Sequence, residues 1–174
     1  NGLQKTCAIV YAAAAGKNIP DAALSQDDYY IIHDLLRGVT SPRVDVYLET
    51  NGGRGEAAEE IVRFLRSKFS EVAFVVSGEA KSAGTIMVLS ADEILMTETG
   101  SLGPIDAQVK IGRSVVSAYD YIEWTDGKRE EANKTNKLSP FDAVMVAQIS
   151  PGELSSVTHA LMFADDLVVE WLSK

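Results

Sequence analysis

Apolar and polar residues form blocks of two kinds along the first part of the chain. A strand is predicted where apolar residues run together or alternate, and a helix where they recur at helical spacing. The predicted strands are Thr6 to Ala12, Val44 to Leu48, Val72 to Val76 and Glu93 to Met96. One predicted helix runs from Ser25 to Leu36, where Tyr29, Ile32, Leu35 and Leu36 form one stripe. A second contains Ala58, Ile61, Val62, Leu65 and Phe69 at helical spacing, and a third runs from Ala83 to Ala91.

Strands that are separated by crossover helices pair in parallel, so the pattern predicts an α/β fold with a mostly parallel sheet. Two of the strand-to-helix turns are rich in small residues, Asn51 to Gly55 and Ser77 to Ser82. Because the carboxyl ends of parallel strands meet at one edge of the sheet, we expect both turns to lie on the same side.

The second part of the chain is more polar. Residues Gly127 to Lys137 include three lysines and one arginine and almost no apolar side chains, which predicts an exposed helix-and-loop arm. Ser139-Pro140 and Ser150-Pro151-Gly152-Glu153 have the pattern of helix starts, with Glu153 completing a capping box. We expect residues 1–174 to form one domain, because the chain contains neither a low-complexity linker nor a further repeat.

Composition limits the possible partners and cofactors. The formal charge of −9, from 16 Lys and Arg against 25 Asp and Glu, disfavours nucleic acid as a partner. His33 and His159 are far apart and Cys7 is the single cysteine, so we predict no metal site and no disulfide within the chain. No stretch has the ~20 apolar residues of a membrane span. We therefore expect a soluble domain, most simply a cytoplasmic one.

Ser82 is the candidate nucleophile. It lies between a predicted strand and a predicted helix, where a turn exposes the hydroxyl and backbone amides face an incoming anion. The amide of Ala83 is one predicted donor to a developing oxyanion. The other is expected from Gly52 and Gly53, whose lack of a side chain lets their amides approach a substrate.

The order and spacing of these turns resemble the Clp protease proteolytic subunit, signal peptide peptidase A and the serine dehydrogenase proteinase family. The resemblance rests on Glu49-Thr50-Asn51-Gly52-Gly53 and on Gly78-Glu79-Ala80-Lys81-Ser82-Ala83-Gly84. Ala91 to Ile94 and Ser101 to Gln108 look especially like the peptidase A and serine dehydrogenase proteinase branch. The resemblance implies a Clp/crotonase-like fold of repeated β-β-α and βα units with a helical arm.

The same resemblance implies peptide-bond hydrolysis through an acyl-enzyme on Ser82, with no cofactor and with a peptide or protein as substrate. Asp106 stands where the Clp subunit carries its histidine, and His159 is the candidate where that family carries its aspartate. A His159 base with Asp106 is one interpretation. A lysine base in a Ser-Lys dyad is the other, with Lys110, Lys128, Lys134 and Lys137 as candidates. Lys110 fits best, because polar surroundings keep the last three charged.

Two functions other than a peptidase are also compatible with the sequence. One is a catalytically silent assembly subunit that keeps the oxyanion turns but has no base. The other is a crotonase-type acyl-CoA enzyme, which Asp106 favours and the absence of a basic phosphate cluster near the glycine turns disfavours. The apolar residues Tyr119, Tyr121, Ile122 and Trp124 at the base of the arm predict a closed homo-oligomer.

Overall fold

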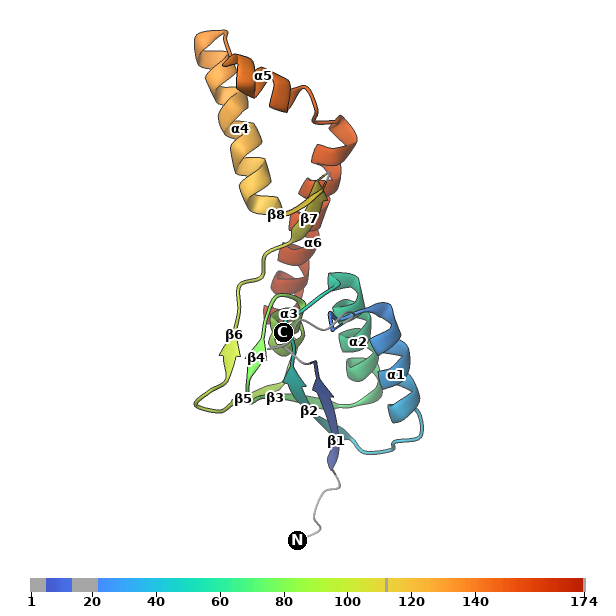
Figure 1. The fold of residues 1–174 in the computed structure, drawn as a ribbon. Helices are drawn as coiled ribbons and strands as arrows, with labels where there is room; N and C mark the ends of the chain where they lie inside the picture. Colours follow the sequence, from blue (N-terminus) through green and yellow to red (C-terminus); the bar gives the residue numbers. More distant parts are fainter. Residues whose placement is uncertain (1–5, 14–21, 112, 174) are drawn as a thin grey trace. The chain divides into compact units, whose positions relative to one another are not determined.

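The computed structural model describes residues 6–13, 22–111 and 113–173, and these form two compact units (Figure 1). Unit 1 comprises Asn1–Ile105 and Leu167–Lys174, and unit 2 comprises Asp106–Asp166. The long helix α6 (Pro151–Leu172) contributes its last residues to unit 1 and the rest to unit 2.

Unit 1 is built on a parallel sheet of four strands in the order β1-β2-β3-β5. The strands are β1 (Thr6–Ala12), β2 (Arg43–Glu49), β3 (Glu71–Val76) and β5 (Glu93–Met96), each paired in parallel with its neighbour. The four strands and their parallel pairing confirm the α/β fold predicted from the hydrophobic pattern.

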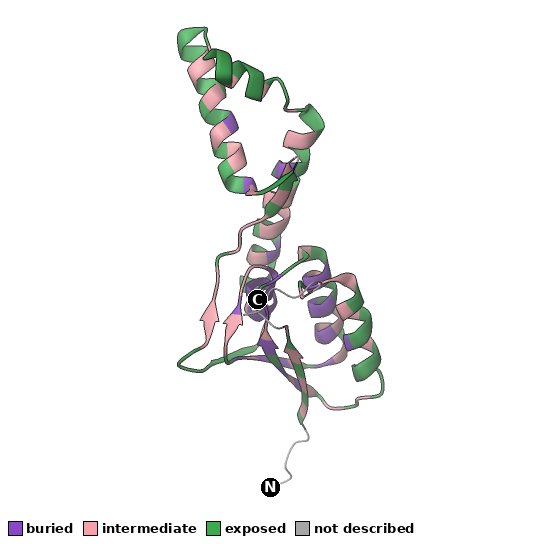
Figure 2. Ribbon diagram, in the orientation of Figure 1, coloured by how far each residue is buried: buried purple, intermediate pink, exposed green. Residues whose placement is uncertain are grey.

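Helices cover one face of this sheet. They are α1 (Gln26–Leu36), α2 (Gly55–Lys68) and α3 (Ala83–Leu89). Alternate residues of β2, Val44, Val46 and Leu48, are fully buried, and buried residues line the inner sides of α2 and α3 (Figure 2). Burying each such aliphatic side chain contributes about 1.5–3 kcal/mol, so this layer is the main stabilising core of the unit.

The stripe expected on α2 is buried throughout, whereas the stripe on α1 is buried only in part, with Tyr29 half-buried. Ala58, Ile61, Val62, Leu65 and Phe69 are all buried on or just after α2. On α1, Ile32 and Leu36 are buried, but Leu35 is 64% exposed and does not belong to the core. Ser25 caps α1 in a capping box with Asp28.

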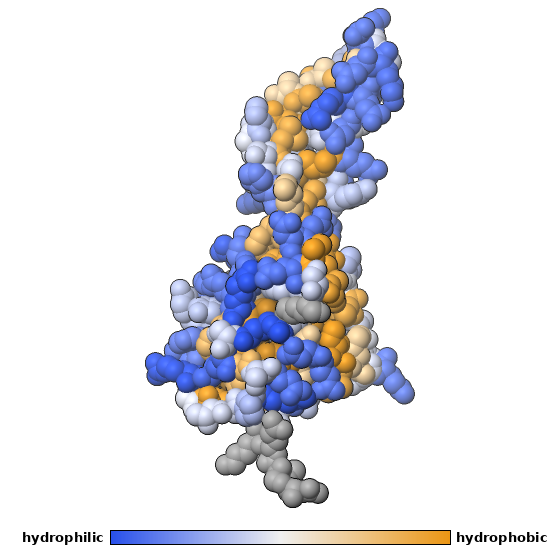
Figure 3. Space-filling model, turned by 180° about the vertical axis from the view of Figure 1, so that it is seen from behind, coloured by the Kyte–Doolittle hydropathy of each residue, from blue (hydrophilic) through white to orange (hydrophobic). Residues whose placement is uncertain are grey.

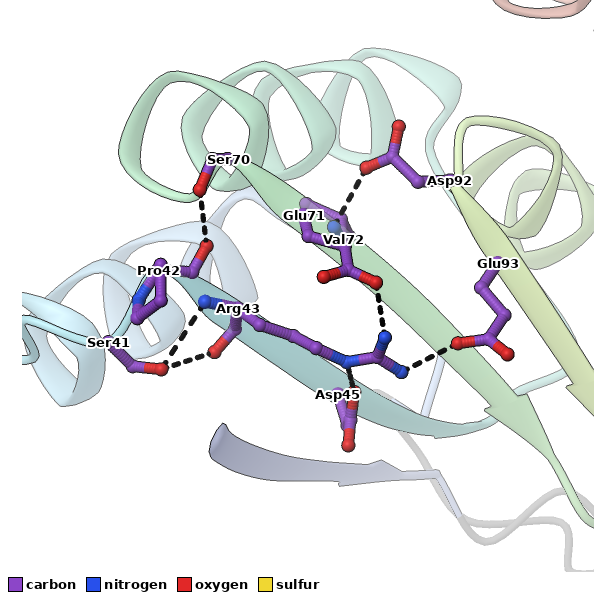
Figure 4. A network of polar contacts seen from close by, with 9 residues as sticks. All are labelled: Ser41, Pro42, Arg43, Asp45, Ser70, Glu71, Val72, Asp92 and Glu93. Carbon is purple, nitrogen blue, oxygen red and sulfur yellow. Dashed lines mark hydrogen bonds and ion pairs between the residues drawn. The ribbon is translucent and has the colours of Figure 1, made fainter. Parts of the chain in front are cut away.

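The opposite face of the sheet carries a charged network centred on Arg43 (Figure 4). Its guanidinium bonds to Asp45 at 2.8 Å, to Glu93 at 2.7 Å and to Glu71. The three carboxylates come from strands β2, β3 and β5, so one side chain joins three strands. These contacts raise the pKa of Arg43, first through the hydrogen bond with Glu93.

A second, smaller parallel sheet was missed by the sequence pattern. It pairs β4 (Glu79–Ala80) with β6 (Ser101–Leu102), and an isolated bridge joins Thr50 to Ala80. Strands of two residues are too short for periodicity to reveal them. They nevertheless position the turn that carries Ser82.

Unit 2 consists of a hairpin and helices. The hairpin pairs β7 (Gln108–Ile111) with β8 (Ser114–Ser117) in antiparallel fashion, and the helices are α4 (Ala118–Thr135), α5 (Pro140–Val146) and most of α6. The polar arm predicted over Gly127 to Lys137 is largely the second half of α4. The predicted helix starts are confirmed, because Ser139 caps α5 and α6 begins at Pro151. The Glu153 carboxylate, which was expected to complete a capping box, accepts the Tyr121 hydroxyl.

Candidate active site

Ser82 stands on a sharp turn between β4 and α3. Its backbone has φ 50° and ψ −119°, and among the described residues only Ser82 and Asn136 have a positive φ without being glycine. Such a conformation costs of order 1–3 kcal/mol and persists only where the surroundings impose it. A strained serine between a strand and a helix is the geometry of a nucleophile elbow, which projects its hydroxyl away from the turn.

Hydrogen bonds on both sides hold the strained turn in place. The Lys81 amide donates to the Thr50 carbonyl at 3.0 Å, and the Ile86 amide donates to the Ser82 carbonyl at 3.1 Å. The Thr85 hydroxyl donates to the Ala80 carbonyl at 2.8 Å and lies 3.0 Å from the Gly103 carbonyl oxygen. Both flanks of Ser82 are thus fixed to neighbouring strands.

The Gly52-Gly53 turn lies directly against Ser82, as the sequence predicted. A Cβ atom added to Gly52 would stand 2.6 Å from the Lys81 carbonyl oxygen and 2.8 Å from the Ser82 Cβ. Gly52 has φ 93°, a conformation that side chains rarely adopt. Contact and conformation therefore both require glycine at this position.

The two glycine amides are engaged differently. The Gly52 amide is buried and donates to the Thr50 hydroxyl at 3.0 Å. The Gly52 carbonyl accepts the Leu24 amide at 2.8 Å. Because that carbonyl and the Gly53 amide belong to one trans peptide plane, they point in opposite directions, and the Gly53 amide points away from Leu24. Gly53 itself is exposed, so this amide is open to a ligand.

The Ala83 amide is the second candidate donor, although Ala83 itself is only 1% exposed. It follows Ser82 as the first amide of α3, a position at which no preceding helical carbonyl exists to accept it. The Ser82 carbonyl is directed along the helix towards Ile86, so the Ala83 amide points out of the helix start. Unit 1 therefore holds a strained serine beside two backbone donors, the arrangement that stabilises an oxyanion.

Two further ionisable side chains of unit 1, Lys81 and His33, have other partners. The Lys81 ammonium pairs with Glu79 at 2.8 Å. The His33 ring stacks on Phe64 with 4.9 Å between ring centroids and lies 3.6 Å from Asp34. His33 is thus a packed residue of α1.

The predicted His159 and Asp106 both belong to unit 2, whereas Ser82 belongs to unit 1. The Asp106 carboxylate accepts Gln108 at 2.7 Å and the Ser117 hydroxyl at 2.8 Å. His159 is an exposed residue of α6, and in the described part of the chain no hydrogen bond joins it to Asp106. Lys110 is exposed on β7, also in unit 2. The identity of the base stays a prediction.

The described residues contain no candidate for a metal site or a membrane span. No group of three or more His, Cys, Asp or Glu side chains in this part of the chain is arranged to hold a metal ion. None of its helices is long and apolar enough to cross a bilayer.

Sequence reasoning did not identify the residues that support the two turns. The Thr50 hydroxyl accepts the Gly52 amide, and the Thr85 hydroxyl donates to the Ala80 carbonyl in the strand before Ser82. Gly103 lies so close to Lys81 that an added Cβ would stand 2.6 Å from the Lys81 Cγ. Their side chains are neither nucleophiles nor bases, so no chemical pattern singles them out. Their position inside the two recognised turns, or just after the next predicted strand, is the one available signal.

Comparison with known proteins agrees with this geometry. Residues 26–138 match the ClpP-like SDH-type serine proteinase family. This segment is more than half of the chain and contains Ser82 and both turns, and the chain therefore belongs to that family.

Individual relatives are more distant. Over 84 residues the chain is 32% identical to the uncharacterized protein MJ0137 of Methanocaldococcus jannaschii, an alignment that covers 48% of this chain and 29% of that protein. The chain spans less than a third of the length of the curated relatives it matches.

Two solved structures of the 1510-N membrane-bound stomatin-specific protease are also similar. A lysine-to-alanine variant in complex with a substrate peptide is 18% identical, with a TM-score of 0.47, over 68% of this chain and 55% of that chain. A serine-to-alanine variant is 15% identical, with a TM-score of 0.47, over 95% of this chain and 74% of that chain.

Proposed function

We propose that this chain is a serine endopeptidase domain that hydrolyses peptide bonds through an acyl-enzyme on Ser82. The observation that carries the proposal is the strained backbone of Ser82, held against Gly52 and next to the amides of Gly53 and Ala83. Membership of a serine proteinase family supports the reaction class. We treat residues 1–174 as one functional domain that binds an extended peptide and uses no cofactor.

In the proposed reaction a base removes the proton of the Ser82 hydroxyl, and Oγ attacks the carbonyl carbon of the scissile bond. The former carbonyl oxygen becomes an oxyanion that accepts the Gly53 and Ala83 amides. The protonated base then gives its proton to the leaving amine, which leaves an ester on Ser82. Water hydrolyses this ester by the same steps and restores the serine.

Two groups are proposed for the base. One is His159, whose imidazole, oriented by Asp106, would accept the serine proton on a ring nitrogen. Lys110 would have to lose its proton to act, which requires burial beside the substrate. A carboxylate alone is a poor base for a serine hydroxyl, so Asp106 is proposed only as a partner of His159.

Covalent labelling tests the proposal. A fluorophosphonate probe reacts with an activated serine, so wild-type protein should be labelled and Ser82→Ala should not, with the fold unchanged by circular dichroism. Ser77→Ala is the matched control, because Ser77 is an exposed serine at the end of β3 and should not affect labelling. Equal labelling of wild type and Ser82→Ala would exclude Ser82 as nucleophile. The same assay on His159→Ala and Lys110→Ala identifies the base.

A catalytically silent assembly subunit is the second candidate. It is favoured by the bonds of Asp106 to Gln108 and Ser117, which leave unit 2 without a preassembled His159–Asp106 pair. A folded wild-type protein that the probe does not label would support this candidate over the peptidase.

A further inference from the structure

Two consecutive glycines are the most conformationally free step in a backbone, so an oxyanion turn made of Gly52 and Gly53 needs external restraints. The restraint on the carboxyl side is Leu24, whose amide donates to the Gly52 carbonyl at 2.8 Å and whose carbonyl accepts the Arg54 amide at 2.9 Å. The restraint on the amino side is the Thr50 hydroxyl, which accepts the Gly52 amide at 3.0 Å.

Thr50 is well placed for this task. It is fully buried, with 0% of its surface exposed. Its backbone is fixed to the strand before Ser82, because its amide donates to the Glu79 carbonyl at 2.7 Å and its carbonyl accepts the Lys81 amide at 3.0 Å. Its hydroxyl therefore links the glycine turn to the segment that carries the nucleophile.

The methyl group of Thr50 faces the other turn. An added Cβ at Gly84 would stand 2.5 Å from the Thr50 Cγ2, so α3 packs tightly on this methyl. One buried side chain thus contacts the oxyanion turn with its hydroxyl and the helix after Ser82 with its methyl.

We propose that Thr50 is a positioning residue that decides which amide of the glycine turn binds the oxyanion. By engaging the Gly52 amide, its hydroxyl fixes the Asn51–Gly52 peptide and leaves the Gly53 amide open towards the substrate. This inference rests on the proposed function, because it assigns a role in the same oxyanion site. Thr50 itself does not touch the reacting atoms.

The variants Thr50→Val and Thr50→Ser separate the two parts of the side chain. Valine keeps the shape and removes the hydroxyl, whereas serine keeps the hydroxyl and removes the methyl. Thr50→Val should release the Gly52 amide, whose protection against hydrogen exchange, measured by NMR, should fall about tenfold, as expected for one lost hydrogen bond.

The same variant should react about tenfold more slowly with the fluorophosphonate, less than the ~10²–10³-fold loss that follows removal of a donor itself. With a peptide substrate kcat should fall while KM stays, because the restrained donor acts in the transition state. Thr50→Ser should keep the Gly52 protection and should restore most of the rate. A purely structural role would instead make both variants lose thermal stability without this split.

Three results overturn the inference. In wild-type protein, a Gly52 amide that exchanges as fast as that of Gly53 would remove its basis, and this measurement needs no variant to fold. A Thr50→Val protein that is labelled at the wild-type rate would overturn the inference but leave the proposed function standing. Wild-type protein that is not labelled at all would overturn the proposed function, and the inference with it.

Discussion

Gly53 has no space for a side chain. A Cβ atom there would stand 2.3 Å from the Leu24 carbonyl oxygen and 2.4 Å from the Leu24 amide nitrogen, and both are backbone atoms that cannot move aside cheaply. Any side chain at this position must therefore displace the turn away from Leu24. Because the Gly53 amide is the proposed oxyanion donor, the displacement should be felt in the chemistry.

Gly53→Val, or the milder Gly53→Ala, should reduce turnover by ~10²–10³-fold, the loss seen when one oxyanion donor is removed. The measurement is the rate of fluorophosphonate labelling, or kcat on a peptide substrate, together with a thermal melt. Gly38→Ala is the matched control, because an added Cβ at Gly38 meets nothing within 4 Å. Full activity in a folded Gly53→Val protein would show that the donor is assigned wrongly.

Sequence predicted part of this site and missed the rest for a physical reason. Ser82 and the glycines could be found because their residue types fit a nucleophile elbow and an oxyanion turn, and the structure places these two turns against each other. Thr50 could not be found by chemistry, since its role depends on which amide its hydroxyl meets in space. The base stays a prediction, because its candidates lie in the other unit.

At the scale of elements, side-chain contacts join the helices of unit 2 to one another. The Tyr121 hydroxyl of α4 donates to the Glu153 carboxylate at the start of α6. The Lys128 ammonium of α4 lies 3.0 Å from the Asp142 carboxylate at the start of α5. Each contact joins α4 to the first turn of another helix, where a carboxylate also interacts favourably with the helix dipole.

The Tyr121 contact predicts a measurable alkaline titration. Burial, followed by the hydrogen bond and the charge of Glu153, raises the pKa of Tyr121 to about 12. A phenol whose folded pKa exceeds its unfolded value of 10.0 contributes stability that is complete below pH 10 and is lost as the pH rises through about 12. NMR of Cζ-labelled tyrosine should therefore show Tyr121 titrating at about 12.

Glu153→Gln should lower this midpoint towards 10 without reaching it, because the charge is removed and the burial remains. Glu123→Gln is the control, since it removes an exposed glutamate from α4 itself and should leave the Tyr121 midpoint in place. A midpoint that does not move in Glu153→Gln would show that the contact is not formed in solution.

The fold of unit 1 was predictable because β2, β3 and the helices α1 to α3 carry the buried apolar residues of its core. The strands of the main sheet and the capped start of α1 follow directly from apolar spacing and from Ser25. The β7–β8 hairpin was not foreseen, because its strands hold at most two consecutive apolar residues, whereas the equally short β5 holds Ile94, Leu95 and Met96 in a row. Leu35 fits the helical period of α1 yet is exposed, since periodicity gives a direction around the helix but not the edge of the covering layer.

For the whole molecule the remaining question is what covers the apolar surface of unit 2. Figure 3 shows a strip of apolar surface beside a polar margin on the helical unit. On α5, Phe141 is 72% exposed, Val144 61% and Met145 43%. A groove of about 250 Å³ in the same unit is lined mainly by apolar side chains, including Leu138, Val146 and Ile149. Exposed apolar side chains and an apolar groove on one unit form a surface that a neighbouring copy of the chain would bury.

We therefore expect a closed homo-oligomer formed through unit 2, in which the apolar side chains of α5 are buried against a neighbouring copy. Phe141→Ser together with Val144→Ser should shift the protein towards single chains, because burying each of these side chains is worth about 1.5–3 kcal/mol. Asn133→Ser, an exposed polar position on α4, is the matched control and should keep the assembly. Light scattering on the purified protein measures the outcome. A wild-type mass equal to one chain of 18.8 kDa at micromolar concentration would contradict the expectation.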